Sequence, residues 1–292
     1  MEILTDPWSW WIEPFADNVS MQRALYAGLL AVLSTSVVGT WVVLRGMSFL
    51  GDALAHGVLP GIAIAFIVGA NTTVGALIAA AVMVVGISVV RTHSPLPDDT
   101  SIGLLFVGML ALAVVVLSAD SSSYTGDLNR FLFGSITGID RGDLWRQGIA
   151  ALVAVAGSVL LHRAFLVLTF DEVYAEVLGF RPRLTHLALL ALVTVSIVAS
   201  FETVGSLLVF AFLIAPPAAA ALVVRRVPLI MTVAVALGAV AVVVGLLVSF
   251  HHDTAAGATM ALVSVAIFTI SFIWSAVRNA LAGRRARAVA PA

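Results

Sequence analysis

Nine long apolar stretches follow one another along the chain, and they limit what it can fold into. They lie at residues 21–44, 53–70, 73–91, 101–119, 144–166, 184–200, 203–224, 229–250 and 255–277. A helix needs about 20 mostly apolar residues to cross a bilayer, and only helices and closed barrels satisfy their backbone polar groups in hydrocarbon. Barrel strands alternate apolar and polar residues, which these stretches do not. The sequence therefore predicts an all-α, polytopic transmembrane helix bundle with eight or nine spans.

The composition excludes several classes of protein. Hydrophobic residues make up 61% of the 292 residues and charged residues 11%, whereas soluble domains have about 45–50% and about 25%. There is no cysteine, which excludes disulfides and thiolate metal sites. All 15 basic residues are arginine, so the chain cannot form the lysine-containing P-loop of ATPases. We expect no enzymatic activity of its own: if ATP drives transport, another chain hydrolyses it. The formal net charge of −1 gives no reason to expect a nucleic-acid partner.

Arginine residues indicate the orientation, because cytoplasmic loops of membrane proteins are enriched in arginine and lysine. In the second half of the chain they place the C-terminus, residues 225–226 and the region of residues 163–183 in the cytoplasm. The loops of the first half carry mixed charge. Nine spans would place the N-terminus outside. Eight would place it inside, with a half-helix between residues 53 and 144 or a re-entrant segment at residues 127–139.

Three regions are expected along the chain. Residues 1–20 are acidic and contain three of the six tryptophans, which suits a segment at the membrane interface; a loosely ordered tail is the alternative. Residues 21–278 form the transmembrane domain. Residues 279–292 form an arginine-rich cytoplasmic tail.

Asp52 and His56 are ionisable residues beside an apolar stretch, and a charged side chain inside a span costs roughly 2.5–3.5 kcal/mol. In a helix their i,i+4 spacing places them on one face. A carboxylate and an imidazole form a ligand pair that suits Mn²⁺, Fe²⁺ or Zn²⁺. Two ligands are too few for a selective site, but a homodimer with its twofold axis through the pair would supply four. The alternative is structural: Asp52 would cap the helix and His56 would donate a hydrogen bond inside the bundle.

Other residues lie where they could line an external mouth or a gate. Glu202 stands at the start of an apolar stretch, where it could also be only a favourable acid at a helix N-terminus. Pro216 and Pro217 interrupt the same stretch; broken helices mark ligand sites and gates in transporters, and a packing kink is the equal alternative. A cluster of ligand-like residues in the next external loop could collect cations, contact a delivery protein or simply be solvated: His251, His252 and Asp253.

Residues 169–179 form a short segment between two apolar stretches on the cytoplasmic side. The segment is acidic at its start, which complements a helix dipole, and ends at Gly179, which fits the position after a helix C-terminus. The pattern predicts a short, capped surface helix at about residues 170–180. It could dock into a groove on a partner, or it could lie on its own bundle. The residues expected to make the partner contact are Phe170, Asp171, Glu172, Tyr174, Glu176, Leu178 and Gly179.

Several of these segments resemble the bacterial ABC-3 permeases, the membrane-spanning half of manganese, zinc and iron ABC importers. Residues 43–61 (VLRGMSFLGDALAHGVLPG) resemble the family signature with its GDA..H motif. Residues 127–136 (DLNRFLFGSI) resemble the family's DL…LFG.IL segment, and residues 170–179 look like its coupling helix. Residues 204–218 resemble its VG.LL…LLI.PAA span, with Pro217 where family members often have alanine. The resemblance extends over nearly the whole chain.

The resemblance implies a homodimeric permease of the bacterial cytoplasmic (inner) membrane, bound to two ABC ATPase subunits and served by a metal-binding lipoprotein. It implies that Asp52 and His56 coordinate the transported divalent metal, with manganese favoured over zinc or iron. No permanently bound cofactor is expected, and ATP would bind to the partner subunits. The alternatives are a proton-coupled secondary cation transporter, an ABC permease for a metal chelate, and an intramembrane enzyme.

Overall fold

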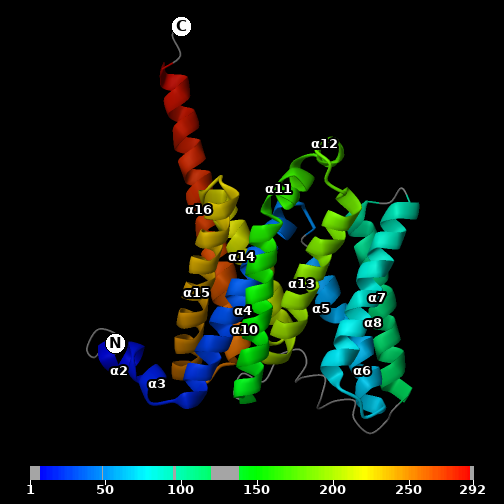
Figure 1. Ribbon diagram of the computed structural model, residues 1–292. Helices are drawn as coiled ribbons and strands as arrows, with labels where there is room; N and C mark the ends of the chain where they lie inside the picture. The colour runs from blue at the N-terminus through cyan, green and yellow to red at the C-terminus, as the bar shows by residue number, and fades with distance from the viewer. Residues whose placement is uncertain (1–6, 48, 95–96, 120–137, 290–292) are drawn as a thin grey trace.

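The computed structural model describes residues 7–47, 49–94, 97–119 and 138–289, and this part of the chain is built of helices without strands (Figure 1). One span consists of two half-helices, α5 (Phe49–Gly57) and α6 (Leu59–Ile67). The other spans are α4 (Val19–Leu44), α7 (Thr72–His93), α8 (Asp98–Ala119), α10 (Arg141–Leu160), α13 (Pro182–Val204), α14 (Ser206–Val223), α15 (Val227–His252) and α16 (Ala256–Val289). Four short helices accompany the spans: α2 (Pro7–Trp11), α3 (Glu13–Ala16), α11 (His162–Phe170) and α12 (Glu172–Val177).

The described residues contain nine segments long and apolar enough to cross a membrane, the higher of the two predicted numbers. Each of the nine predicted stretches is confirmed as a helical span. The prediction was wrong at residues 161–166, because α10 ends at Leu160 and α11 begins at His162. His162 and Arg163 are costly in hydrocarbon, so the span ends before them. Residues 127–139 were considered as a re-entrant segment. Of these, residues 127–137 lie outside the described residues.

The two ends of the bundle differ in what they carry. Helix α12, the turn between α14 and α15, and the C-terminal end of α16 lie at one end, and α2 and α3 lie at the other (Figure 1). The first of these ends holds the arginines at 225 and 226 and those flanking α12, which marks it as cytoplasmic. Helices α2 and α3 lie at the opposite end, which is therefore the external one (Figure 1).

Helices α4 and α14 cross closely at the centre of the bundle because α14 contains two buried prolines. Pro216 has no N–H, so the carbonyl of Phe212 lacks its intrahelical partner. The hydroxyl of Ser36 in α4 donates to that carbonyl across 3.3 Å. Pro217 likewise leaves the carbonyl of Leu213 without its intrahelical bond, and that oxygen packs against Gly39. The prolines of α14 and the small residues of α4 thus form a single interhelical contact.

A second close crossing joins α6 to α7. A methyl group added to Gly61 would overlap the carbonyl oxygen of Gly75, and one added to Gly75 would overlap that of Gly61. Small residues let membrane helices approach to backbone contact, which supplies the van der Waals packing that holds such helices together. The half-helix α6 is therefore held by its neighbour although it is only nine residues long.

The α4–α14 crossing generates a stability prediction. Gly39→Ala should lower the free energy of unfolding by about 1–3 kcal/mol or more, because the new methyl group meets a backbone carbonyl that cannot rotate away. Gly108→Ala is the matched control, since Gly108 lies in α8 with nothing within 4 Å of an added methyl group. Thermal unfolding of the two purified variants checks this, and equal unfolding temperatures would contradict the described crossing.

Candidate functional site

Helix α5 brings Asp52 and His56 together on one turn. The imidazole Nδ1 of His56 lies 3.2 Å from a carboxylate oxygen of Asp52 and 3.1 Å from the backbone oxygen of Asp52. The helix begins at Phe49, so Asp52 lies inside the first turn and is not the N-cap. The predicted i,i+4 placement on one face is confirmed, and the imidazole is held by the carboxylate through Nδ1. Its Nε2 is then the ring atom available to a ligand.

The break between α5 and α6 follows the pair directly. The helix is interrupted at Val58, and Pro60 lies in the first turn of α6. Because Pro60 has no N–H, the carbonyl of His56 cannot accept the usual helical hydrogen bond. Carbonyls released in this way at broken spans are the groups with which transporters bind cations. The break therefore adds a backbone oxygen to the neighbourhood of the two side chains.

One flank of α5 remains partly open. The side chains of His56 and Asp52 are 24% and 28% exposed, whereas most of the other residues of this helix are buried in the bundle. Phe106 of α8 borders the flank and meets the imidazole edge-on, with ring centroids 6.0 Å apart. Among the described residues no three His, Asp or Glu side chains are close enough to hold one metal ion. A single chain thus offers an incomplete ligand set on an accessible flank.

The residues predicted for an external mouth or gate do not gather around α5. Pro216 and Pro217 are buried against α4, as described above. Glu202 is in the last turn of α13, so its predicted place at a helix N-terminus was wrong: Gly205 turns the chain three residues later, and α14 begins only at Ser206. The side chain of Glu202 lies outside the described part. Gly205, with φ +82°, makes the external turn from α13 to α14. These positions leave the mouth and gate roles as predictions.

The histidines at the end of α15 contact their own chain. His251 stacks on Trp10 with ring centroids 4.6 Å apart and planes 8° apart. Its Nε2 lies 3.1 Å from the backbone oxygen of Trp10, and His252 Nδ1 lies 3.1 Å from the oxygen of Val248. Asp253 closes the helix in the left-handed conformation with φ 49°. The stack attaches the N-terminal helix α2 to the external end of α15.

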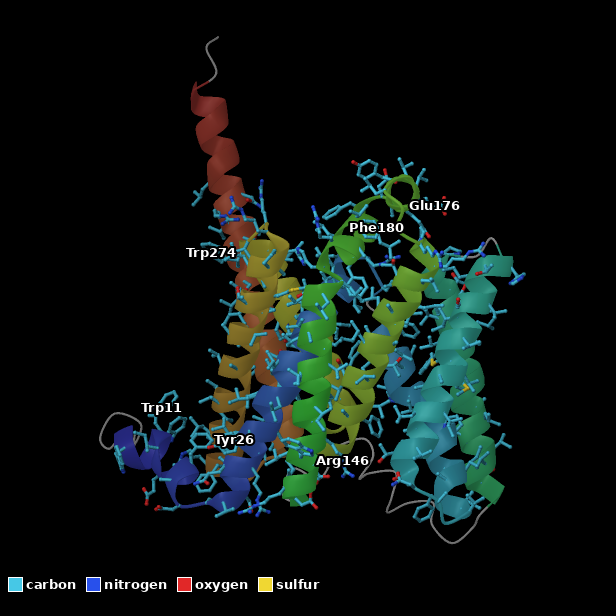
Figure 2. All side chains as sticks on the ribbon, viewed as in Figure 1. Trp11, Tyr26, Arg146, Glu176, Phe180 and Trp274 are labelled. Atoms are coloured by element: carbon cyan, nitrogen blue, oxygen red, sulfur yellow. The ribbon has the colours of Figure 1, made fainter. Side chains whose placement is uncertain are left out.

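The predicted surface helix is confirmed as α12. The Asp171 carboxylate accepts a hydrogen bond from the Tyr174 N–H across 2.9 Å, and Gly179 has φ +83° after the helix end. Ala175 is fully buried, so the helix lies on the bundle by one face only. Its outer face is apolar and exposed, with Glu176 and Phe180 at this end of the bundle (Figure 2). The exposed apolar side chains of α12 and of the residues that flank it are Phe170, Val173, Tyr174, Val177 and Leu178.

Two features of this structure were not found from the sequence. Gln147 of α10 is fully buried and donates to Ser200 across 2.8 Å and to Ser34 across 3.3 Å. A lone amide in an apolar stretch was the available signal. The second feature is an ion pair of 2.9 Å between Arg91, near the end of α7, and Glu172 of α12. No sequence spacing links residues so far apart.

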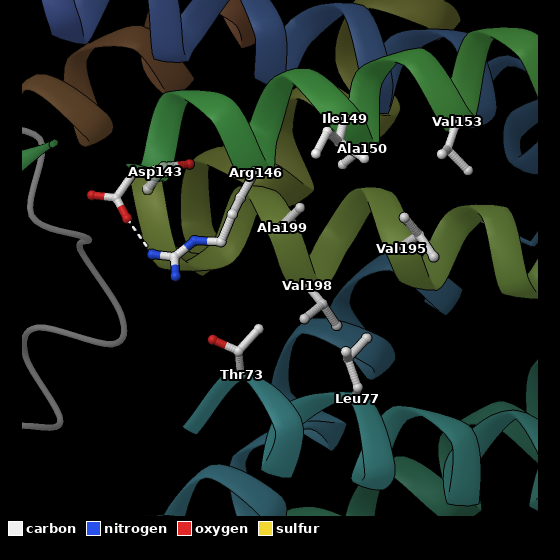
Figure 3. A pocket seen from close by; sticks show the side chains of 11 residues that line it. Thr73, Leu77, Asp143, Arg146, Ile149, Ala150, Val153, Val195, Val198 and Ala199 are labelled. Atoms are coloured by element: carbon white, nitrogen blue, oxygen red, sulfur yellow. Dashed lines mark hydrogen bonds and ion pairs between the residues drawn. The ribbon is translucent and has the colours of Figure 1, made fainter. Parts of the chain in front are cut away.

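A cavity of about 230 Å³ lies near the external end, between α7, α10 and α13 (Figure 3). The ion pair between Asp143 and Arg146 stands at one side of it. The rest of its wall is mostly apolar, with Leu77, Val153 and Val198 among the lining residues. Neither Asp52 nor His56 lines this cavity, so it offers a cation few ligands.

The ABC 3 transport family matches residues 17–275. The chain belongs to this family. It is 35% identical to the "Manganese transport system membrane protein MntC" of Listeria monocytogenes, over 91% of this chain and 94% of that protein. It is 34% identical to the "Chelated iron transport system membrane protein YfeD" of Yersinia pestis, over 91% and 89%. The solved structure of PsaBC from Streptococcus pneumoniae in complex with Fab matches with a TM-score of 0.79 and 29% identity, over 90% and 94%.

Family membership confirms several predictions made from the sequence. The chain is a multi-pass permease subunit of the bacterial inner membrane. It is not an ATPase, which agrees with the lack of lysine in the chain. The resemblance drawn from residues 43–61 and 204–218 is confirmed by a match that spans both segments.

The cap of α12 generates a local prediction. Asp171→Ala removes the acceptor for the Tyr174 N–H and should destabilise α12 by about 0.5–2 kcal/mol. A loss of that size corresponds to hydrogen exchange of the Tyr174 amide with solvent that is roughly two- to thirty-fold faster. Asp171→Asn keeps the acceptor and is the matched control. Equal exchange rates in the two variants would show that the carboxylate does not cap the helix.

Proposed function

We propose that this chain is the permease of an ATP-driven importer for a divalent transition metal, with manganese favoured over zinc or iron. The observation that carries the proposal is the Asp52–His56 pair on the partly open flank of a broken span. A carboxylate oxygen and an imidazole nitrogen are ligands that Mn²⁺, Fe²⁺ and Zn²⁺ accept. Relatives named for manganese transport at 35% identity and for iron transport at 30% identity support this class of substrate.

The incomplete ligand set favours a second copy of the chain as the partner at this site. Two copies related by a twofold axis near α5 would bring two Asp52 and two His56 side chains to one ion. The carboxylates would offset the cost of holding a divalent cation in a low-dielectric environment. The exposure of Asp52 and His56 in the single chain supports this arrangement, since a complete site within one chain would leave them buried.

The outer face of α12 suits the ATPase subunits. In this proposal two ABC ATPase subunits bind the exposed apolar residues of α12, and their closure on ATP moves the helix. The Arg91–Glu172 ion pair would transmit that movement into α7, which packs against α6. A metal-binding lipoprotein would deliver the ion at the opposite, external end. The metal is the cargo and leaves the site in each cycle.

A permease for a metal chelate is the second candidate, because one relative is named for chelated iron transport. A chelate carries its own ligands, so it would need little from the His56 imidazole. A proton-coupled secondary transporter has no support from membership of an ABC transport family. The two remaining candidates differ in whether Asp52 and His56 bind the ion directly.

Removing either side chain tests the proposed site. Asp52→Ala and His56→Ala should each reduce manganese uptake at least about tenfold, because each loses a ligand worth more than 1.4 kcal/mol. His93→Ala is the matched control, since His93 makes the same kind of bond from Nδ1 to the oxygen four residues earlier, across 3.0 Å, and pairs with no acidic side chain in the described ranges. Uptake into cells and co-purification with the ATPase are measured together. Normal uptake in both site variants would refute direct coordination.

The preference for manganese is tested by metal binding to the assembled transporter. Mn²⁺ at 100 times its dissociation constant should stabilise the folded complex by about 2.7 kcal/mol. The thermal shift should be larger for Mn²⁺ than for Zn²⁺ or Fe²⁺, and His56→Ala should remove it. A larger His56-dependent shift with Fe²⁺ or Zn²⁺ would contradict the manganese preference and leave the site intact. Stabilisation only by a chelate would favour the second candidate.

A further inference from the structure

A polar cavity of about 310 Å³ lies at the cytoplasmic end, next to the start of α12. Helix α7, helix α13 and Glu172 of α12 form its walls. It is separate from the Asp52–His56 site, because neither of those residues lines it. The lining residues are Ser88, Arg91, Thr92, Glu172, Arg183 and His186.

His186 is the buried polar group of this cavity. The residue is 2% exposed, and neither ring nitrogen has a hydrogen-bond partner among the described residues. A neutral imidazole carries one donor and one acceptor, and a buried ring normally satisfies them. His186 lines the cavity, so a ligand bound there is the group that could supply the missing partner.

The charges of the lining select the kind of ligand. The lining contains two arginines, Arg91 and Arg183, and one acidic residue, Glu172, whose carboxylate already pairs with Arg91 at 2.9 Å. A divalent cation would find one engaged acidic ligand and repulsion from Arg183. An oxyanion would find the guanidinium of Arg183, an imidazole N–H and the hydroxyl of Ser88; the hydroxyl of Thr92 already donates to the carbonyl of Ser88 across 2.8 Å. Guanidinium groups match the geometry of phosphate in particular.

The position of the cavity fits the same chemistry. It opens at the cytoplasmic membrane surface between two spans, where basic pockets bind the headgroups of anionic lipids. A water molecule occupies about 30 Å³ of liquid, so the volume admits a phosphate group. We propose that this cavity binds a phosphate group, carried by an anionic phospholipid of the inner leaflet or present as free phosphate, through Arg183, His186 and the hydroxyl of Ser88.

A bound phosphate would lie beside the ion pair that attaches α12 to α7. It would add a negative charge near Glu172 and a second acceptor for Arg91, so it would alter how firmly α12 is held. Binding itself does not depend on the transport function proposed above. An experiment can therefore refute phosphate binding without refuting the proposed transport function, and the reverse.

The test uses the assembled transporter in lipid nanodiscs. In one arm the discs contain phosphatidylglycerol in phosphatidylcholine, and retained anionic lipid is measured by native mass spectrometry. In the other arm the discs contain phosphatidylcholine alone, and inorganic phosphate is titrated and followed by ³¹P NMR. Binding in the first arm only identifies the lipid as the source, and binding in the second identifies free phosphate.

Three variants decide whether the binding is at this cavity. Arg183→Gln should weaken binding at least about tenfold, because the variant loses the charge-assisted hydrogen bond from the guanidinium group to the phosphate. His186→Leu should weaken it as well and keep the packing of a buried side chain. Arg181→Gln is the control, since Arg181 is an exposed arginine two residues away that does not line the cavity. No binding in either arm, or an equal loss with Arg181→Gln, would overturn the proposal.

Discussion

Hydrocarbon gives a backbone polar group nothing to bond to, and the rest of this structure depends on how the chain meets that constraint. Where a helix is regular, the constraint is met within the helix. Where proline removes a donor, a neighbouring helix must meet it instead. In α14 the freed carbonyl of Phe212 receives the hydroxyl of Ser36, and the next carbonyl lies against Gly39. The two prolines therefore fix which residues of α4 stand opposite them.

The same rule applies to the second span, where we propose that the cation binds. Pro60 releases the carbonyl of His56, and the half-helices α5 and α6 are held by close packing on both sides of the break. Some polar side chains also find partners within the bundle. The amide N–H groups of Gln147 donate to Ser34 and Ser200, and the Asp52 carboxylate pairs with the imidazole one turn away. The Asp52–His56 pair at the break remains partly open.

The sequence predicted what is decided locally. Apolar length fixes the spans, so all nine were found, and the caps of α12 follow from Asp171 and Gly179. The end of α10 was missed because Leu161 is as apolar as its neighbours and only the following His162 and Arg163 mark the break. Within the candidate site, the shared face of Asp52 and His56 was predictable because one helical turn joins them.

Contacts between distant residues were not predictable from one chain. Ser36 and Phe212 are 176 positions apart, and Arg91 and Glu172 are 81 apart. Nothing in the local pattern of either partner specifies the other. His186 shows the same limit, because a histidine near an arginine-rich helix start reads as a surface residue until its helix is packed. Contacts with the second copy proposed at α5 are not predictable for the same reason, because nothing in the local pattern specifies a partner residue.

The contact between the Asp52 carboxylate and His56 Nδ1 has a consequence for release. In the proposed site, the carboxylate that holds Nδ1 would orient the ring and strengthen Nε2 as a donor to a metal without being a ligand itself. If its side chain turns away from the ring, it becomes a ligand itself. One rotation about a side-chain bond would thus change both the number and the charge of the donor atoms while the backbone stays in place. A carrier that must first capture and then surrender its cargo would need no larger rearrangement at the ion.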